Sequence, residues 1–240
     1  MPRVSIVIPA RNEAENIGPL IDGIQAACAG DDVEIIVVDD ASTDATRDAV
    51  IARMGADNLR LLTHAPGGGQ SAGVHSGVLA ARAGLCATLD GDGQNPPEEL
   101  PKLYAPLLAE GADVRLGLVA GQRVGRKDSW SKKAASKAAN WLRVRLLNDG
   151  TRDTGCGLKA FRRDAFLALP YFNHMHRYLP ALFTRDGWIV SHVDVSHRSR
   201  MAGRSNYTNF GRALVGVIDL LGVVWLMRRR KVARATEERL

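Results

Sequence analysis

The residues of this chain that are best suited to chemistry are acidic side chains that directly follow two predicted strands. Asp39 and Asp40 close one β-branched apolar run, and Asp90 and Asp92 close another. In an open parallel sheet, the carboxyl ends of the strands border the crevice in which ligands bind. The spacing therefore predicts that both acidic pairs face one crevice.

A single glycine separates Asp90 from Asp92, and Gln94 follows closely. Oxygen ligands on a tight loop suit Mg²⁺ or Mn²⁺, which complete their coordination with waters and substrate phosphates. The alternative is an Asp-rich turn that caps the helix expected from Pro97, because Asp and Gly also favour turns. The preceding strand and the second acidic pair favour the metal-binding interpretation.

Short β-branched runs alternate with helical patterns along the chain. Strands are expected at residues 4–8, 34–38, 59–62, 85–89, 114–120 and 188–195. Helices are expected at 13–27, from Ser42 as N-cap, from the Gly67–Gly69 turn to about 83, from Pro97, and at 129–147. This alternation predicts an α/β fold, a mainly parallel sheet with helices on both faces.

Two loops beside the expected crevice have more than one interpretation. Residues 9–13 fit a helix start with Asn12 as its cap, and equally a polar loop at the crevice edge. Gly67, Gly69 and Ala72 fit a loose dinucleotide-binding pattern, but they follow the third strand rather than the first. We therefore interpret these glycines as a turn that permits close backbone approach.

Composition limits the class of protein and its partners. The chain has 240 residues and a formal net charge of +6, so we expect one sizeable domain with an acidic partner, such as nucleic acid, anionic lipid or phosphate-bearing substrates. Aromatic residues make up 5% and no nucleic-acid-binding motif occurs, which argues against a nucleic-acid partner. Three widely spaced cysteines and a start without a signal-peptide layout favour a reduced cytosolic setting.

The C-terminal part of the chain has a different character. Residues 214–227 are apolar except for Asp219, and the basic residues 228–231 follow. The stretch is shorter than the roughly 20 residues that a membrane span needs. Apolar residues surround the expected helix, which favours burial in a membrane surface or against a small membrane-protein partner over a core helix. We thus expect one main domain at 1–207 and an interfacial helix with a basic tail at 208–240.

Together these motifs resemble the family-2 glycosyltransferases with the GT-A fold, and within them the dolichol-phosphate mannose synthase branch. The resemblance extends from Val4 to about Tyr207 and rests on five ordered blocks: IPARNE at 8–13, VVDDASTD at 37–44, LDGDGQNPPE at 89–98, DTGCG with KAFR at 153–162, and HRSRMAGRSNY at 197–207. It implies inverting transfer of a sugar from GDP-mannose or a UDP-sugar to a polyprenyl phosphate, at the cytoplasmic face of the membrane. The product would be a lipid-linked monosaccharide for envelope or glycan assembly.

The resemblance also implies roles for individual residues. The catalytic residues would be Asp90, Asp92 and Arg200. The nucleotide-sugar would contact Pro9, Arg11, Glu13, Asp39 and Asp90, and the Mg²⁺ or Mn²⁺ ion would be held by Asp92 and Gln94. The acceptor phosphate would face Arg123, Lys132, Ser136 and Arg200. A lipid phosphate is already anionic, so its attack would need positioning by cations rather than a general base.

The sequence departs from the family pattern at four positions. Arg11 stands where an aromatic residue is common, Ala41 replaces a usual glycine, Lys132 an arginine and Asn206 a lysine. The change at Arg11 leaves base and sugar preference open, and a family member with a non-lipid acceptor stays an alternative. A nucleotidyltransferase would need a basic glycine-rich loop after the first strand, which residues 9–13 lack.

His174 and His176 supply only two ligands of the metal-binding kind. We expect them to be structural residues or part of an acceptor groove.

Overall fold

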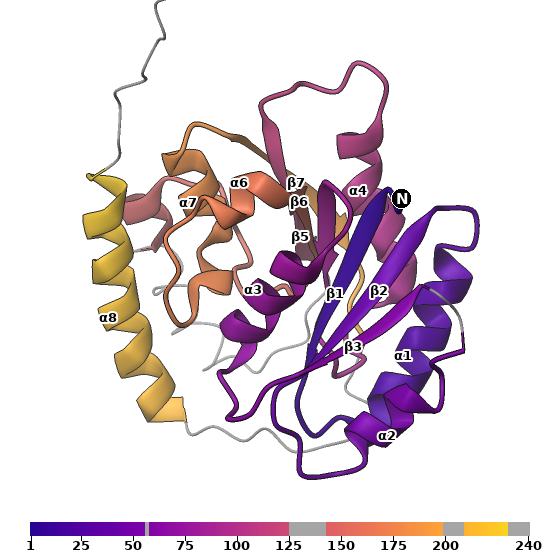
Figure 1. The fold of residues 1–240 in the computed structure, drawn as a ribbon. Helices are drawn as coiled ribbons and strands as arrows, with labels where there is room; N and C mark the ends of the chain where they lie inside the picture. The colour runs from indigo at the N-terminus through magenta and orange to yellow at the C-terminus, as the bar shows by residue number, and fades with distance from the viewer. Residues whose placement is uncertain (56–57, 125–142, 199–208, 230–240) are drawn as a thin grey trace, which may run out of the picture.

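The computed structural model describes residues 1–55, 58–124, 143–198 and 209–229. This part of the chain forms a seven-stranded sheet in the order β3-β2-β1-β4-β6-β5-β7, with helices on both faces (Figure 1). The predicted helix at 129–147 lies mostly outside the described residues, although 143–147 are helical. The α/β architecture with a mainly parallel sheet is confirmed.

The first half of the sheet consists of four parallel strands: β1 (Val4–Ala10), β2 (Val33–Asp39), β3 (Leu59–Thr63) and β4 (Leu85–Thr88). Every residue of β1 and β2 is buried, as their near-continuous apolar sequences predict. The helices α1 (Ala14–Ala27), α2 (Thr46–Ile51) and α3 (Gln70–Ala80) connect these strands. After β4, the 3₁₀ turn η1 (Pro97–Glu99) leads directly into α4 (Leu100–Leu108).

The second half contains β5 (Leu116–Arg123), β6 (Lys159–Arg162) and β7 (Ile189–Val195). Between and after them come α6 (Arg163–Leu167), η2 (Met175–Arg177), α7 (Leu179–Arg185) and α8 (Asn209–Met227). The sequence did not predict β6, which runs antiparallel to both β4 and β5. β5 also starts later than predicted, because Asp113 turns back to accept the backbone N–H of Arg115 and leaves Val114 exposed.

Two apolar layers cover the sheet. Beneath one face, α1 and α4 contribute Ile17, Ile21, Ile24, Leu100, Leu103 and Leu107. Beneath the other face, α3, α6, α7 and α8 contribute Val74, Val78, Phe166, Leu182, Phe183 and Val223. Both layers hold the strands rigidly, so that the loops at their ends are fixed in position.

The loops after β1 and β2 differ from the predicted helix caps. α2 begins at Thr46 rather than Ser42, whose hydroxyl instead accepts the backbone N–H of Asn12 at 2.9 Å. The Asn12 side chain in turn accepts the N–H of Thr43 at 2.8 Å, so the two polar loops bind each other. Ala41 has a φ of 56°, in the left-handed region, which explains why glycine is usual at this position.

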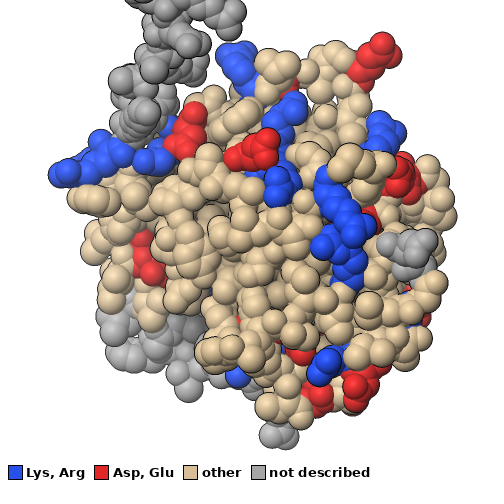
Figure 2. Space-filling view, viewed as in Figure 1, with Lys and Arg blue, Asp and Glu red and all other residues tan. Residues whose placement is uncertain are grey.

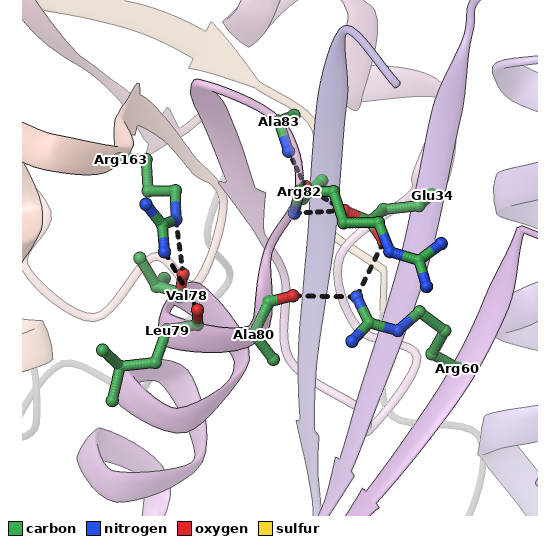
Figure 3. Close-up of polar contacts among 9 residues, drawn as sticks. Glu34, Arg60, Val78, Leu79, Ala80, Arg82, Ala83 and Arg163 are labelled. Atoms are coloured by element: carbon green, nitrogen blue, oxygen red, sulfur yellow. Dashed lines mark hydrogen bonds and ion pairs between the residues drawn. The ribbon is translucent and has the colours of Figure 1, made fainter. Parts of the chain in front are cut away.

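Helix α3 is fixed at its C-terminal end by two arginines (Figure 3). Arg60 donates to the carbonyl of Ala80 at 2.8 Å and to the carboxylate of Glu34 at 2.9 Å. Arg163 donates to the carbonyls of Val78 and Leu79 at 3.0 and 2.9 Å. Carbonyls in the last turn of a helix lack a full set of backbone partners, although that of Val78 also accepts the N–H of Ala81 at 3.3 Å. Cations at this end also complement the helix dipole. The opposite end of α3 is thereby held at the carboxyl edge of the sheet.

Helix α8 packs along one side of the molecule through Leu220, Val223 and Val224 (Figure 1). Its opposite face exposes a row of apolar side chains, namely Val217, Ile218, Leu221 and Trp225. The helix therefore packs on the domain with one face and exposes apolar side chains on the other. Among the described residues, no helix has the length and apolar character required to cross a membrane.

Candidate functional site

A pocket of about 970 Å³ opens at the carboxyl edge of the sheet. Its lining includes the loop after β1, with Pro9, Arg11 and Glu13, and the loop after β4, with Asp90 and Asp92. The rest comes from Asp40, from the start of α3, from residues 154–157 with Lys159, and from His176, Arg177 and Leu179. The structure thus brings together five of the residues that the sequence analysis placed in the site.

Asp90 lies at the centre of this lining. Its carboxylate accepts the side-chain amide of Gln70 at 2.6 Å and that of Asn95 at 3.4 Å. Burial, and next the negative charge of Asp92, raise the pKa of Asp90 to about 6, although the positive charges of Lys159 and Arg123 oppose the rise. The negative charge of Asp92 thus disfavours ionisation of Asp90, and a bound cation would relieve this repulsion.

The antiparallel strand β6 delivers a second set of residues to Asp90. Lys159, its first residue, pairs with Thr88 at the end of β4, and the Thr88 hydroxyl donates to the carbonyl of Gly157 at 2.9 Å. The Lys159 ammonium is buried and donates to the carbonyl of Cys156. Burial lowers the pKa of Lys159, while the nearby carboxylates of Asp90 and Asp153 favour its charged form. A buried lysine side chain held by the Cys156 carbonyl therefore lies near Asp90.

Of the acidic pair after β2, Asp40 lines the pocket as expected, whereas Asp39 does not. Asp40 accepts the backbone N–H groups of Gly68 and Gly69 at 2.7 and 2.8 Å, and it contacts His64 Nδ1 at 2.8 Å. The glycine turn therefore binds a protein carboxylate, which leaves those N–H groups unavailable to a dinucleotide phosphate. Asp39 is buried at the same strand end, accepts the N–H of Ser42 at 3.1 Å, and does not line the pocket.

The chemistry of the acidic loop fits a hard divalent cation. Asp92 accepts the backbone N–H of Gln94 at 3.1 Å, which closes a tight turn after β4. Gln94 itself is half-buried and does not line the pocket. No group of three or more His, Cys, Asp or Glu side chains in the described ranges could hold a metal ion. The donors here are carboxylate oxygens, which suit a Mg²⁺ or Mn²⁺ ion that keeps waters and substrate phosphates.

Only one of the four predicted acceptor residues lies within the described residues. Arg123 forms a two-pronged ion pair with Asp153, with distances of 2.5 and 2.8 Å, and both side chains are partly buried. The pair raises the pKa of Arg123; burial of Asp153 alone would raise its pKa, but the arginine lowers it. Lys132, Ser136 and Arg200 lie outside the described residues.

Two further residues line the pocket: Arg177, for which the sequence suggested no role, and His176, which was expected to be a structural or acceptor-groove residue. The His176 ring hydrogen-bonds to the hydroxyl of Ser71 at 2.7 Å. Burial, and then the charges of Lys159 and Arg177, lower the pKa of His176 to about 3, so its ring is neutral. Both residues lie on a 3₁₀ turn, which has no periodic pattern that could have indicated a site.

Comparison with known proteins adds to this geometry. The model of the family "Glycosyl transferase family 2" matches residues 5–169. The dodecaprenyl-phosphate galacturonate synthase of Rhizobium johnstonii is 33% identical over 238 residues, which cover 94% of this chain and 67% of that protein.

Solved structures of similar fold include the glucosyl-3-phosphoglycerate synthase of Mycobacterium tuberculosis. Its complex with Mn²⁺, UDP-glucose and glycerol 3-phosphate has a TM-score of 0.72 and 20% identity, covering 94% of this chain and 80% of that one. Its complex with Mg²⁺ and UDP has a TM-score of 0.70 and 18% identity, covering 94% and 79%. These matches confirm the predicted GT-A-type fold.

Proposed function

This chain belongs to glycosyl transferase family 2 and is a glycosyltransferase, and from this premise we propose that it moves a sugar from a nucleotide diphosphate to a polyprenyl phosphate. The observation that carries the proposal is the Asp90–Asp92 pair at the carboxyl edge of the sheet, inside a pocket large enough for a nucleotide-sugar. The relative named as a dodecaprenyl-phosphate galacturonate synthase supports the lipid acceptor.

The donor in this proposal is a UDP-sugar rather than GDP-mannose. The two solved structures of similar fold described above hold UDP or UDP-glucose. The 33% identical relative is named as a galacturonate synthase, and galacturonate is a uronic acid. The nucleotide occupies the part of the pocket next to Pro9, Arg11 and Glu13, with Asp39 supporting the loop beside it. The diphosphate lies at Asp90 and Asp92, and the sugar extends towards Lys159.

The reaction is a single displacement. An oxygen of the polyprenyl phosphate forms a bond to the anomeric carbon, the bond from that carbon to the diphosphate oxygen breaks, and the nucleoside diphosphate leaves with the electron pair. The anomeric centre is inverted. A divalent cation held by Asp92, with Asp90 and Gln94 nearby, would supply charge neutralisation for the leaving diphosphate. The attacking phosphate is already anionic, so no side chain has to remove a proton.

Helix α8 is the part of the chain that we propose to contact the membrane. Its exposed apolar row, followed by Arg228 and Arg229, is the arrangement of a helix that lies on an anionic membrane surface. Figure 2 shows basic side chains gathered near the upper end of this helix. In this account residues 1–207 form the catalytic unit, and residues 208–240 attach it peripherally to the cytoplasmic leaflet, alone or with a small membrane protein.

A donor screen tests the proposal. Purified protein is incubated with radiolabelled nucleotide-sugars, Mg²⁺ or Mn²⁺ and a polyprenyl phosphate, and the label extracted into organic solvent is counted. We expect label in the organic phase with a UDP-sugar, none with EDTA, and recovery when metal is restored. Asp92→Ala should lose activity by about a hundredfold or more while the protein remains folded. Full activity in EDTA would contradict the metal-dependent mechanism.

The acceptor side of the site has its own test. Lys132→Ala and Arg200→Ala should impair transfer far more than they weaken donor binding, because both cations are assigned to the acceptor phosphate. Calorimetry with the donor alone, set beside transfer rates, separates the two effects. Equal losses in both measurements would assign these cations to the donor.

A further inference from the structure

The basic residues around the pocket differ in what they bind. Lys159 donates to the carbonyl of Cys156. Arg123 is ion-paired with Asp153, and its guanidinium lies against Gly155. Arg11 is exposed on the nucleotide side of the pocket. Arg177 is half-buried in the opposite wall, and its guanidinium forms no hydrogen bond or ion pair with any other described residue. It is thus a cation available to a ligand.

The backbone around Arg177 is nevertheless held firmly. His176 binds Ser71 at the start of α3, and Tyr178 donates its hydroxyl to the carbonyl of Gly216 in α8 at 3.3 Å. His174 contacts Asp219, also in α8, at 2.9 Å. The segment 174–178 therefore connects the pocket wall to α8, and it fixes where the guanidinium can reach. Such a support lowers the cost of ordering a ligand-binding side chain.

Helix α8 presents its exposed apolar row on the side away from this segment. Val217, Ile218, Leu221 and Trp225 are 55, 62, 61 and 56% exposed and recur at helical spacing. Gly216 and Asp219, which contact segment 174–178, lie on the opposite half of the helix, together with the core residue Val223. The helix that we propose to lie on the membrane is therefore joined through its inner half to the pocket wall that contains Arg177.

Charge favours the same assignment. The acceptor phosphate must approach the donor diphosphate, which is also negatively charged. It therefore needs a nearby cation that is not already paired with the carboxylates of the acidic loop. Arginine binds phosphate oxygens through two parallel N–H groups, which also orients the attacking oxygen. We propose that Arg177 binds the phosphate of the lipid acceptor, a role that neither Arg123 nor Lys159 can fill while their present contacts persist. This inference rests on the proposed function for the identity of the acceptor.

Direct binding tests the proposal without turnover. The probe is geranyl phosphate, a short soluble prenyl phosphate, titrated by calorimetry into wild type, Arg177→Gln, Arg177→Lys and the control Arg47→Gln on the exposed surface of α2. We expect Arg177→Gln to weaken geranyl phosphate by about tenfold or more, Arg177→Lys to weaken it less, and Arg47→Gln to leave it unchanged. Geraniol, which lacks the phosphate, should bind all four proteins alike. UDP affinity and the thermal midpoint should not change.

Several results would overturn it. If Arg177→Gln weakens UDP as much as geranyl phosphate, Arg177 serves the donor. If geranyl phosphate binds equally to wild type and Arg177→Gln, or does not bind wild type, Arg177 is not an acceptor residue. Arg177-dependent binding without transfer from any nucleotide-sugar would instead contradict the proposed function and leave the assignment of Arg177 standing.

Discussion

Gly157 lies directly against the carboxylate of Asp90, so that a Cβ at residue 157 would overlap the Asp90 side chain. Three elements cause this contact: the loop after β4, the antiparallel strand β6, and the pairing of Thr88 with Lys159. Asp90 can therefore occupy this position only because residue 157 has no side chain.

Gly157→Ala should displace Asp90 while leaving the core intact. We expect the transfer rate to fall by about a hundredfold, because a misplacement of about 1 Å in a reactive site has effects of this size. Gly84→Ala is the matched control, since nothing lies within 4 Å of a Cβ at that position. Transfer rates and thermal unfolding of both variants check the prediction. Near-normal activity in Gly157→Ala would mean that Asp90 has room to move.

The donor affinity should depend on pH through Asp90. Its pKa is raised to about 6 by burial and by the charge of Asp92, so the carboxyl is ionised at neutral pH and becomes protonated as the pH falls through 6. A protonated carboxyl cannot assist a divalent cation, so metal-dependent binding of UDP should weaken over that range. Calorimetry in a pH series with Mg²⁺ measures the midpoint. A midpoint near the ordinary aspartate value would contradict this assignment.

Glu34 should support stability without affecting chemistry. Burial raises the pKa of its carboxyl, but hydrogen bonds from Ser5, Arg82 and Arg60 outweigh burial and hold the pKa below the usual 4.5. The stabilisation is therefore complete above pH 4.5 and is lost as the pH falls further towards the folded-state pKa. Glu34→Gln should lower the free energy of unfolding by about 3 kcal/mol at neutral pH, with a smaller difference in acid.

Urea unfolding at several pH values measures that difference, and UDP binding serves as the control. A constant difference at all pH values would show that the Glu34 charge is not responsible.

The exposed row on α8 should determine membrane binding. Replacing Ile218 and Leu221 together by Glu removes apolar surface and adds negative charge, so sedimentation with anionic vesicles should fall sharply while UDP binding persists. Val114→Glu, at a position 78% exposed elsewhere on the molecule, is the control. Reversal of Arg228 and Arg229 should weaken vesicle binding most at low salt, because salt screens the attraction. Unchanged sedimentation would assign the row to another partner.

The parallel part of the sheet and the acidic loop could be predicted because their signals are local. β1, β2 and β4 are continuous apolar runs, and Asp90 and Asp92 follow directly after the last of them. β6 could not be predicted, since its four residues have no pattern of their own and are defined by pairing with distant strands.

The same reasoning explains the site residues that the sequence missed. Lys159 reaches Asp90 only because β6 is antiparallel, and Arg177 reaches the pocket through contacts of its segment with α3 and α8. The assignment of Asp40 to the glycine turn also depends on a contact between residues far apart in sequence. Spacing along the sequence identifies residues that could bind ligands or metal ions. Long-range pairing of strands and loops decides which of their side chains share a pocket.

The central claim is that the acceptor is a lipid phosphate. The most direct test offers a polyprenyl phosphate in vesicles and 3-phosphoglycerate in solution together, with the preferred UDP-sugar and Mg²⁺, and identifies the glycosylated product by mass spectrometry. We predict that the sugar appears on the polyprenyl phosphate and that 3-phosphoglycerate is unmodified. Sugar found on 3-phosphoglycerate, with the lipid untouched, would contradict the account.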